Sequence, residues 1–249
     1  MKKKYKALIL DVDGTLVPNK PDGMPSQKVT EAISKASKKI HIGVGTSRPY
    51  YLLEHIVNHL KLTGPSIING GAQIININSR KVFWEKTIDE KDYKNICQIL
   101  KRLDMPFFVH DGENDIIPTK KLLPKKIYNI GAFNLNPSIV KKLLSQISYI
   151  PTIVLHKTPA WEKGKISILI SHASVSKQFA IFEIAKLLGI ETHEIIGVGD
   201  GYNDFPLLMA CGLKIAMGNA VPELKEIADY IAPPVEKDGV ADIIERFVL

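Results

Sequence analysis

Residues 11–16 read Asp-Val-Asp-Gly-Thr-Leu and follow directly on a short apolar run at residues 5–10. Such a run suits a parallel strand that is buried on both faces. In open α/β sheets, ligands bind just beyond the carboxyl ends of the strands. Two carboxylates one residue apart, Asp11 and Asp13, can supply a nucleophile and an acid/base there. An Asp-Gly turn after a strand is the plainer alternative, and a calcium loop lacks its third ligand position and closing glutamate.

The segments outward from this stretch alternate between strands and helices. On the N-terminal side we expect strands at residues 5–10, 40–45 and 65–68, with helices at 26–38, capped by Ser26, and at 49–61. After residue 172 we expect helices at 176–188, 203–211 and 240–247 and strands at 194–199, 213–217 and 229–231. This alternation predicts an α/β fold with a doubly wound parallel sheet.

The middle of the chain has a different pattern. It predicts strands at residues 82–85, 106–110, 127–133, 152–156 and 166–170, and helices at 89–103 and from Asn136 or Ser138 to 147. We interpret this part as an inserted α+β cap at residues 79–165, between core segments at 1–78 and 166–249.

Composition indicates a globular protein without a membrane span. Apolar residues make up 45% and charged residues 24% of 249 positions, and no apolar stretch reaches the ~20 residues that cross a bilayer. The basic N-terminus is followed within a few residues by Asp11, which indicates a buried strand and not a signal peptide. Only Cys97 and Cys211 occur, without a metal-binding spacing, so we expect a cytoplasmic protein without disulfides.

The positive charge is concentrated in the predicted cap. Residues 79–165 contain 16 Lys and Arg against 9 Asp and Glu, which accounts for the whole net charge of +7. A solvated surface explains any single lysine, but the sum would attract an anionic substrate. No nucleic-acid recognition motif accompanies these lysines, so we do not expect a nucleic-acid partner.

Two further polar positions fall at ends of predicted core elements. Thr46 and Ser47, followed by Arg48, end the second strand and offer hydroxyl and N–H groups just before a helix, where a phosphate oxygen can bind. A simple helix cap is the alternative. Lys177 lies in the first turn of its helix, where the macrodipole opposes its charge. We interpret it as a ligand for a buried anion, although an exposed lysine is the common case.

A last cluster follows the strand at residues 194–199. Asp200 and Asp204 lie four residues apart across a turn into a helix, so both can face one point. With Asp11 they would supply the oxygen ligands that Mg²⁺ prefers. Asn203 and Asp204 as ordinary helix-start residues are the alternative.

The order of these clusters resembles the four motifs of the haloacid dehalogenase superfamily. Residues 11–16 resemble the first motif, Thr46-Ser47-Arg48 the second, Lys177 the third, and Gly199-Asp200 with Asn203-Asp204 the fourth. Ser47 departs from the Gly that is usual in this branch. The sequence is similar to the capped sugar-phosphatase branch, which includes sucrose-phosphate, mannosyl-3-phosphoglycerate and archaeal phosphoglycolate phosphatases. The resemblance spans nearly the whole chain and implies a Rossmann-like core with a C2-type cap.

The resemblance also implies a role for each motif residue. Asp11 attacks phosphorus to form an aspartyl-phosphate, and Asp13 protonates the leaving alcohol and then activates water. The implied phosphate- or substrate-binding residues are Thr46, Ser47, Arg48, Lys177 and Asn203. The implied ligands of Mg²⁺ are Asp11, the Asp13 carbonyl, Asp200 and Asp204, the last directly or through water.

Two alternatives stay open from the sequence. A phosphomannomutase-like phosphotransferase would use the same core chemistry, whereas a non-catalytic anion- or nucleic-acid-binding protein would use the basic cap alone. The expected partner is a small phosphorylated metabolite. Its identity would depend on cap side chains, for which residues 111–114, Lys120, Lys121, Lys125 and Lys126 are the polar, loop-like candidates. The oligomeric state is not predicted.

Overall fold

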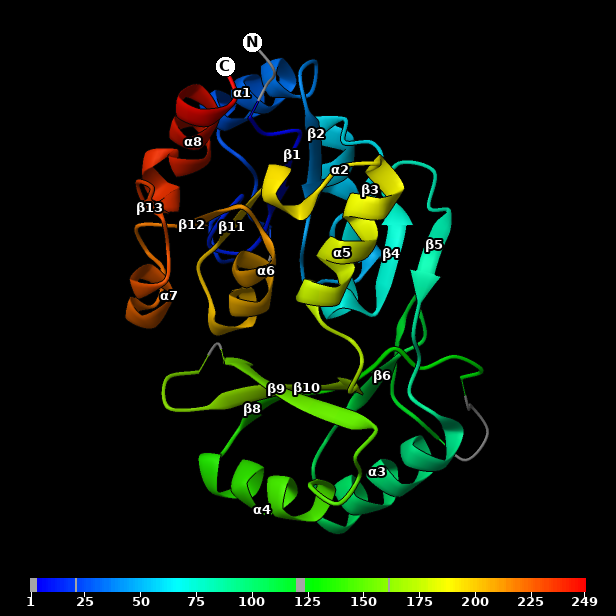
Figure 1. Ribbon diagram of the computed structural model, residues 1–249. Coiled ribbons are helices and arrows are strands. Elements are labelled where there is room, and N and C mark those ends of the chain that lie inside the picture. Colours follow the sequence, from blue (N-terminus) through cyan, green and yellow to red (C-terminus); the bar gives the residue numbers. More distant parts are fainter. Residues whose placement is uncertain (1–3, 21, 120–123, 161) are drawn as a thin grey trace. The chain divides into compact units, whose positions relative to one another are not determined.

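The computed structural model describes residues 4–20, 22–119, 124–160 and 162–249 (Figure 1). The chain divides into two compact units. The core consists of Met1–Arg48, Leu52–Trp84 and Ser176–Leu249, and the cap consists of Pro49–Tyr51 and Glu85–Val175.

A parallel sheet organises the core, with the strand order β13-β12-β11-β1-β2. Its strands are β1 (Ala7–Leu10), β2 (His41–Val44), β11 (Ile195–Gly199), β12 (Leu213–Ala216) and β13 (Tyr230–Ile231). β1 lies in the middle and all four of its residues are buried, which explains why an uninterrupted apolar run forms this strand. β3 (Pro65–Ile68), β4 (Gln73–Asn76) and β5 (Val82–Glu85) form a second sheet, and a parallel bridge from Gly45 to Ile67 joins it to the end of β2.

Helices cover the parallel sheet. The core helices are α1 (Gln27–Ala36), α2 (Glu54–Leu60), α5 (Lys177–Leu188), α6 (Phe205–Ala210), α7 (Pro222–Glu226) and α8 (Gly239–Phe247). Ala7 and Ile9 of β1 belong to the apolar cluster formed with α5 and α6, so alternation along the strand directs Leu8 and Leu10 to the other face. As predicted, Ser26 caps α1, its hydroxyl accepting the Val29 N–H at 3.2 Å.

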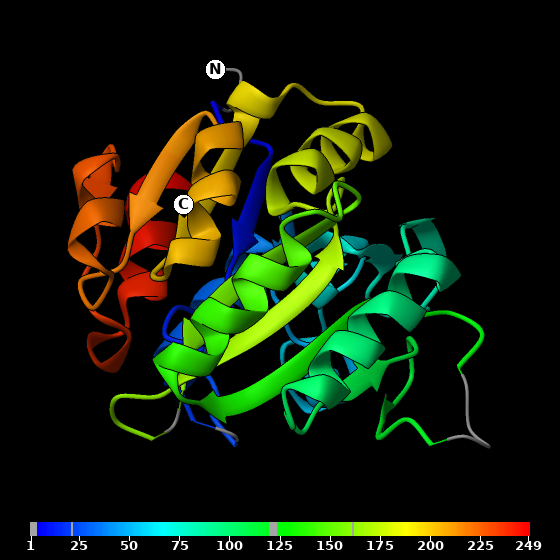
Figure 2. The same cartoon turned by 90° about the horizontal axis from the view of Figure 1, so that it is seen from below.

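The cap is built on an antiparallel sheet with the strand order β7-β6-β8-β10-β9. Its strands are β6 (Phe108–His110), β7 (Asp115–Ile116), β8 (Asn129–Leu135), β9 (Ile153–Pro159) and β10 (Ile166–His172). Helices α3 (Glu90–Arg102) and α4 (Pro137–Ile147) cover one face of this sheet (Figures 1 and 2). Val109, Ile130 and Ile170 point from the sheet into the apolar cluster beneath these helices. The residues that alternate with them form the opposite face, called here the helix-free face.

The predicted elements are all found within a few residues, but short ones escaped prediction. β4, β7 and α7 were not predicted; each has five residues or fewer. β10 was assigned to the core segment at 166–249, yet it is hydrogen-bonded to β8 and β9 of the cap sheet. The cap unit accordingly covers Glu85–Val175 where residues 79–165 were predicted, and β5, predicted within the cap, pairs in the sheet of β3 and β4.

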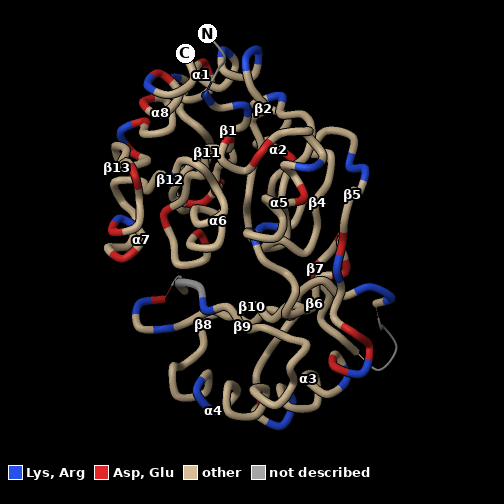
Figure 3. The backbone as a smooth tube through the Cα atoms, in the orientation of Figure 1, with Lys and Arg blue, Asp and Glu red and all other residues tan. Residues whose placement is uncertain are grey.

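The cap's basic residues lie largely on its helices and loops (Figure 3). Lys91, Lys94, Lys101 and Arg102 belong to α3, and Lys141 and Lys142 to α4. Of the predicted cap candidates, Lys125 is exposed and Lys126 is paired with Glu85, whereas Lys120 and Lys121 lie outside the described residues. Cys97 and Cys211 are buried and free. None of the described helices combines the length and apolarity that crossing a membrane requires.

Candidate functional site

The loop after β1 presents two aspartates at the carboxyl edge of the parallel sheet. Asp11 is 5% exposed, and its N–H continues the pairing of β1 with β11 by donating to the Val198 carbonyl at 2.9 Å. Gly14 turns the chain with φ at +75°, and a Cβ there would lie 2.3 Å from the Asp200 carboxylate. Only glycine therefore fits where the first and fourth motifs meet.

Lys177, the residue of the third motif, is buried and contacts residues of the first and the fourth motifs. Lys177 is 2% exposed, at the start of α5, and its Nζ donates to Asp11 Oδ1 at 2.8 Å and to Asp204 Oδ1 at 2.6 Å. Burial alone would lower the pKa of Lys177, but the charges of Asp11 and Asp204 outweigh it and hold that pKa above its ordinary value. The lysine is therefore a fixed positive charge beside the Asp11 carboxylate.

Asp204 is held by the backbone as well as by Lys177. Its Oδ2 accepts the N–H groups of Asp200 at 3.0 Å and of Gly201 at 2.9 Å, while Oδ1 accepts from Lys177. The side chain is fully buried. Since both oxygens already have donors, Asp204 fixes the loop and the lysine in the present arrangement.

Three carboxylates form a cluster that suits a divalent cation. Asp11, Asp200 and Asp204 each offer one oxygen, and these oxygens lie within 4.8 Å of one another. Lys177 is the cation that contacts two of these carboxylates, Asp11 and Asp204. Burial, followed by repulsion from Asp204, raises the pKa of Asp11 well above its usual range and that of Asp200 to about 7. A hard cation bound by oxygen ligands would relieve this repulsion, so the residues fit such an ion.

Asp13 and Arg48 form an ion pair in the same region. The guanidinium donates from Nε to Asp13 Oδ2 at 2.8 Å and from Nη2 to Asp13 Oδ1 at 2.5 Å. A bidentate pair of this kind fixes the plane of the carboxylate. Arg48 was predicted to bind phosphate; the structure places its guanidinium on the candidate acid/base.

The other predicted phosphate-binding residues lie at the end of β2 and the start of α6. Thr46 is buried, and its hydroxyl accepts the Arg48 N–H at 3.1 Å, which leaves its proton for another acceptor. Asn203 Nδ2 lies 3.5 Å from Ser47 Oγ. The second and fourth motifs are therefore adjacent, and every predicted motif residue belongs to the core.

Thr15 and Asn219 belong to the site but were not predicted as site residues. The Thr15 hydroxyl donates to Asp200 Oδ1 at 3.1 Å. Asn219 Nδ2 donates to the Gly14 carbonyl at 2.8 Å and lies 3.4 Å from Asp200 Oδ2. Asn219 lies in the loop after β12, as Asp200 lies directly after β11, and a polar residue just beyond a buried strand is the sequence signal for it.

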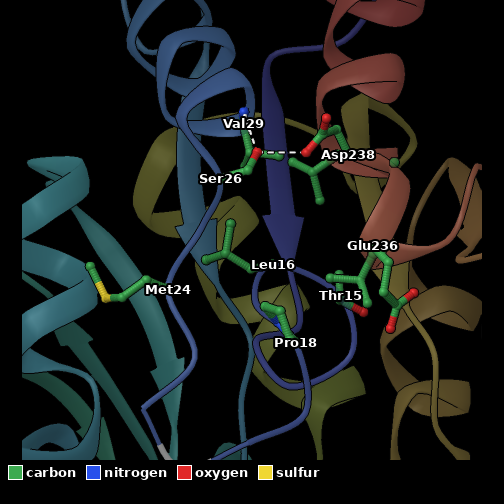
Figure 4. Close-up of a pocket in the computed structure, with 11 residues that line it drawn as sticks. Thr15, Leu16, Pro18, Met24, Ser26, Val29, Glu236 and Asp238 are labelled. Atoms are coloured by element: carbon green, nitrogen blue, oxygen red, sulfur yellow. Dashed lines mark hydrogen bonds between the residues drawn. The ribbon is translucent and has the colours of Figure 1, made fainter.

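A separate cavity in the core contains none of these carboxylates. It has a volume of about 180 Å³ and is lined by residues that include Thr15, Leu16, Ser26, Glu236 and Asp238 (Figure 4). Ser26 Oγ donates to Asp238 Oδ1 at 2.6 Å at its wall. This bond ties the start of α1 to the start of α8.

Comparisons with known proteins show the family to which the sequence belongs. The sequence matches the haloacid dehalogenase-like hydrolase family over residues 8–160 and 112–244. It is 26% identical to a putative phosphatase of Bacillus subtilis, YxeH, over 98% of this chain and 99% of the relative. It is 27% identical to phosphoglycolate phosphatase 2 of Saccharolobus solfataricus, over 96% and 90% of the two chains.

Solved structures show the same fold. A haloacid dehalogenase-like hydrolase from Bacteroides thetaiotaomicron superposes with a TM-score of 0.84 at 23% identity, covering 98% of this chain and 99% of that one. The subclass IIB sugar phosphatase BT4131 superposes with a TM-score of 0.80, also at 23% identity, over 97% and 98%. The predicted family resemblance and the predicted α/β fold with a separate cap sheet are confirmed.

Proposed function

The chain belongs to the haloacid dehalogenase-like hydrolases, and we propose that it is a magnesium-dependent phosphatase that hydrolyses a small phosphomonoester. The observation that carries the proposal is the buried contact of Lys177 with Asp11 and Asp204, beside Asp200. A nucleophile, a fixed cation and a cluster of metal-binding oxygens lie together at the edge of the sheet where ligands bind.

In the first step, Asp11 attacks the phosphorus atom. A P–O bond forms to the Asp11 carboxylate, and the bond to the alcohol oxygen breaks. Asp13, protonated at this stage, gives its proton to the leaving oxygen. The products of this step are the free alcohol and an aspartyl-phosphate.

In the second step, water attacks the phosphorus of that aspartyl-phosphate. Asp13 takes a proton from the water, the bond from phosphorus to Asp11 breaks, and inorganic phosphate leaves. Arg48 holds the Asp13 carboxylate through two hydrogen bonds, so it orients the acid/base between these steps. This assigns Arg48 a positioning role in place of direct phosphate binding.

Charge neutralisation comes from both the protein and the cation. Lys177 and the Thr46 hydroxyl are the protein groups that bind phosphoryl oxygens, and Lys177 offsets the charge that develops on them. Asp11 and Asp200 would hold Mg²⁺, which supplies electrostatic stabilisation of the phosphoryl group when bound. Asp204 contributes through Lys177 and the loop, because its oxygens already accept three hydrogen bonds.

The test is a phosphate-release assay with and without Mg²⁺. The substrates are 4-nitrophenyl phosphate, hexose and polyol phosphates, and phosphoglycolate, with an Asp11→Asn variant as the background control. Magnesium-dependent release by the wild type alone supports the proposal. Transfer of the phosphoryl group to a sugar hydroxyl that requires an added sugar bisphosphate and releases no inorganic phosphate would indicate a phosphotransferase instead. Neither release nor transfer from any ester would overturn the proposal.

A further inference from the structure

Two side-chain donors face the Asp200 carboxylate, one at each of its oxygens. The Thr15 hydroxyl donates to Oδ1 at 3.1 Å. The Asn219 amide nitrogen lies 3.4 Å from Oδ2 and donates to the Gly14 carbonyl at 2.8 Å. All four residues belong to the core unit. The two donors therefore connect the loops that follow β1, β11 and β12 around one candidate ligand of the cation.

Thr15 is a fixed donor to Oδ1. Its side chain is fully buried, and branching at Cβ restricts the rotation of its hydroxyl-bearing carbon. A hydrogen bond from a buried hydroxyl to a carboxylate is stronger than an exposed bond between neutral groups, because the acceptor is charged and the surroundings exclude water. Loss of this hydroxyl would therefore release one oxygen of Asp200.

The orientation of the Asn219 amide is also fixed. Its Oδ1 accepts the Val235 N–H at 2.9 Å, while its Nδ2 faces the Gly14 carbonyl. A carbonyl cannot donate and an N–H cannot accept, so only this orientation of the amide satisfies both neighbours. Nδ2 is therefore the atom that faces Asp200 Oδ2. Asn219 is exposed, so we expect it to contribute less than Thr15.

The main chain and the packing around Asp200 add further constraints. The Asp200 N–H donates to Asp204 Oδ2 at 3.0 Å, and the Asp200 carbonyl accepts the Val221 N–H at 2.9 Å. Gly14 packs so closely against the side chain that a Cβ there would lie 2.3 Å from Oδ2. Together with the two donors, these contacts restrict the plane of the carboxylate.

A carboxylate held in one plane affects divalent cations differently. Mg²⁺ requires near-ideal octahedral geometry with oxygens at about 2.0–2.1 Å, whereas Ca²⁺ accepts about 6–8 oxygens at about 2.3–2.6 Å in variable geometry. Mg²⁺ therefore gains more from ligands that are held in place and loses more when they can turn. Replacing a group that orients a metal ligand typically changes metal affinity by about 10–100-fold.

We propose that Thr15 and, to a smaller extent, Asn219 are positioning residues that make the core site prefer Mg²⁺ to Ca²⁺ by holding Asp200 in one orientation. This inference rests on the proposed function and extends it from the binding of a divalent cation to the discrimination between two cations. Both residues act through Asp200 and are not themselves ligands.

The experiment measures cation binding without substrate. The Tm of thermal unfolding is followed as Mg²⁺ or Ca²⁺ is added, because the rise in Tm with concentration reports the Kd of a cation that binds the folded protein. Thr15→Val keeps the shape of the side chain but removes the hydroxyl. We expect it to raise the Kd for Mg²⁺ by about 10-fold or more and the Kd for Ca²⁺ by less than about threefold. Protons compete with both cations for the same carboxylates, so the ratio of the two constants cancels their effect.

Three further variants separate positioning from a general loosening of the loops. Thr15→Ser retains the hydroxyl and should keep most of the preference for Mg²⁺. Asn219→Ala should raise the Kd for Mg²⁺ selectively by about threefold, as expected for one exposed hydrogen bond. Thr152→Val is the matched control: it removes the same kind of bond, from a threonine hydroxyl to the Asp92 carboxylate in the cap, and should change neither constant.

Equal weakening of both cations by Thr15→Val, or no change in either Kd, would overturn the inference while leaving the phosphatase function intact. If Thr15→Val fails to fold, Asn219→Ala decides, because that side chain is exposed, and the absence of a selective loss in it would overturn the inference. A wild type whose Tm responds to neither cation and that releases no phosphate with Mg²⁺ would overturn both.

Discussion

Buried polar side chains occur in both units of the molecule, but their hydrogen bonding differs. In the core, Lys177, Asp11 and Asp204 bond to one another and to the backbone. In the cap, His110 Nε2 and Ser171 Oγ have no partner within the described chain. The first arrangement is charged and hydrogen-bonded, whereas the second leaves two buried polar atoms without a hydrogen bond among the described residues. We therefore assign the proposed reaction to the charged groups of the core.

The largest effect is expected from the core nucleophile. Asp11→Asn keeps the shape of the side chain but removes the attacking carboxylate, so kcat should fall by at least about 10³-fold on every ester. Asp104→Asn, at an exposed position with φ at +50° that asparagine tolerates, is the control. Steady-state kinetics and a circular dichroism spectrum measure both. Substantial activity in a folded Asp11→Asn variant would contradict the assignment.

The second-largest effect on kcat is expected from removal of the divalent cation. Asp11 and Asp200 repel each other without a counterion, so a chelator should reduce kcat by about 10²–10³-fold on all substrates alike. Added Mg²⁺ should restore activity, and Ca²⁺ should not, since calcium favours looser coordination of higher number. Undiminished turnover in excess chelator would mean that the carboxylate cluster has another purpose.

Lys177→Ala should reduce kcat by about 10²-fold at any ionic strength. The ammonium lies beside the nucleophile and is buried, so salt screens its contribution little. Lys186→Ala, in the exposed last turn of the same helix, should leave kcat unchanged. Thermal unfolding of both variants checks that the loss is not a loss of fold. A large salt dependence of the Lys177→Ala defect would place this lysine at the surface instead.

The smallest effect is expected from the basic cap surface. Lys125→Ala should raise KM about twofold at low salt, with kcat unchanged and the effect lost at high salt, because an exposed charge acts by attraction over distance. Lys126→Ala should do less, since Glu85 already compensates that charge. Lys28→Ala on α1 of the core is the control. An unchanged KM for Lys125→Ala would indicate that the positive charge of the cap keeps its surface solvated but does not attract the substrate.

The site residues of the core could be predicted from the sequence because most of them come directly after core strands. The residues concerned follow strands: Asp11 follows β1, Thr46 follows β2 and Asp200 follows β11. They meet because the carboxyl ends of parallel strands lie at the same edge of the sheet, and the apolar runs of the sequence already indicate those strands. Lys177 stood out because a lysine in the first turn of a helix is disfavoured. What the pattern could not provide was the pairing of Arg48 with Asp13, which depends on side-chain reach across two loops.

That His110, Asn129 and Ser171 of the cap are neighbours could not be predicted for a different reason. His110, Asn129 and Ser171 are ordinary polar residues in strands, and their alignment depends on the register of three strands far apart in the sequence. A shift of one residue would turn any of them to the helix side. The sequence pattern instead pointed to lysines and polar loops, because it indicates which residues are exposed but not which face of a sheet a strand residue occupies.

The proposed phosphorylation of Asp11 can be tested directly. An Asp13→Asn variant incubated with 4-nitrophenyl phosphate and Mg²⁺ should accumulate the intermediate, because nitrophenolate leaves without a proton but water is no longer activated. Reduction of the quenched protein with borohydride converts an acyl phosphate to homoserine, which peptide mass spectrometry locates. We expect homoserine at position 11. Nitrophenolate release with an unmodified Asp11, or homoserine at another aspartate, would contradict it.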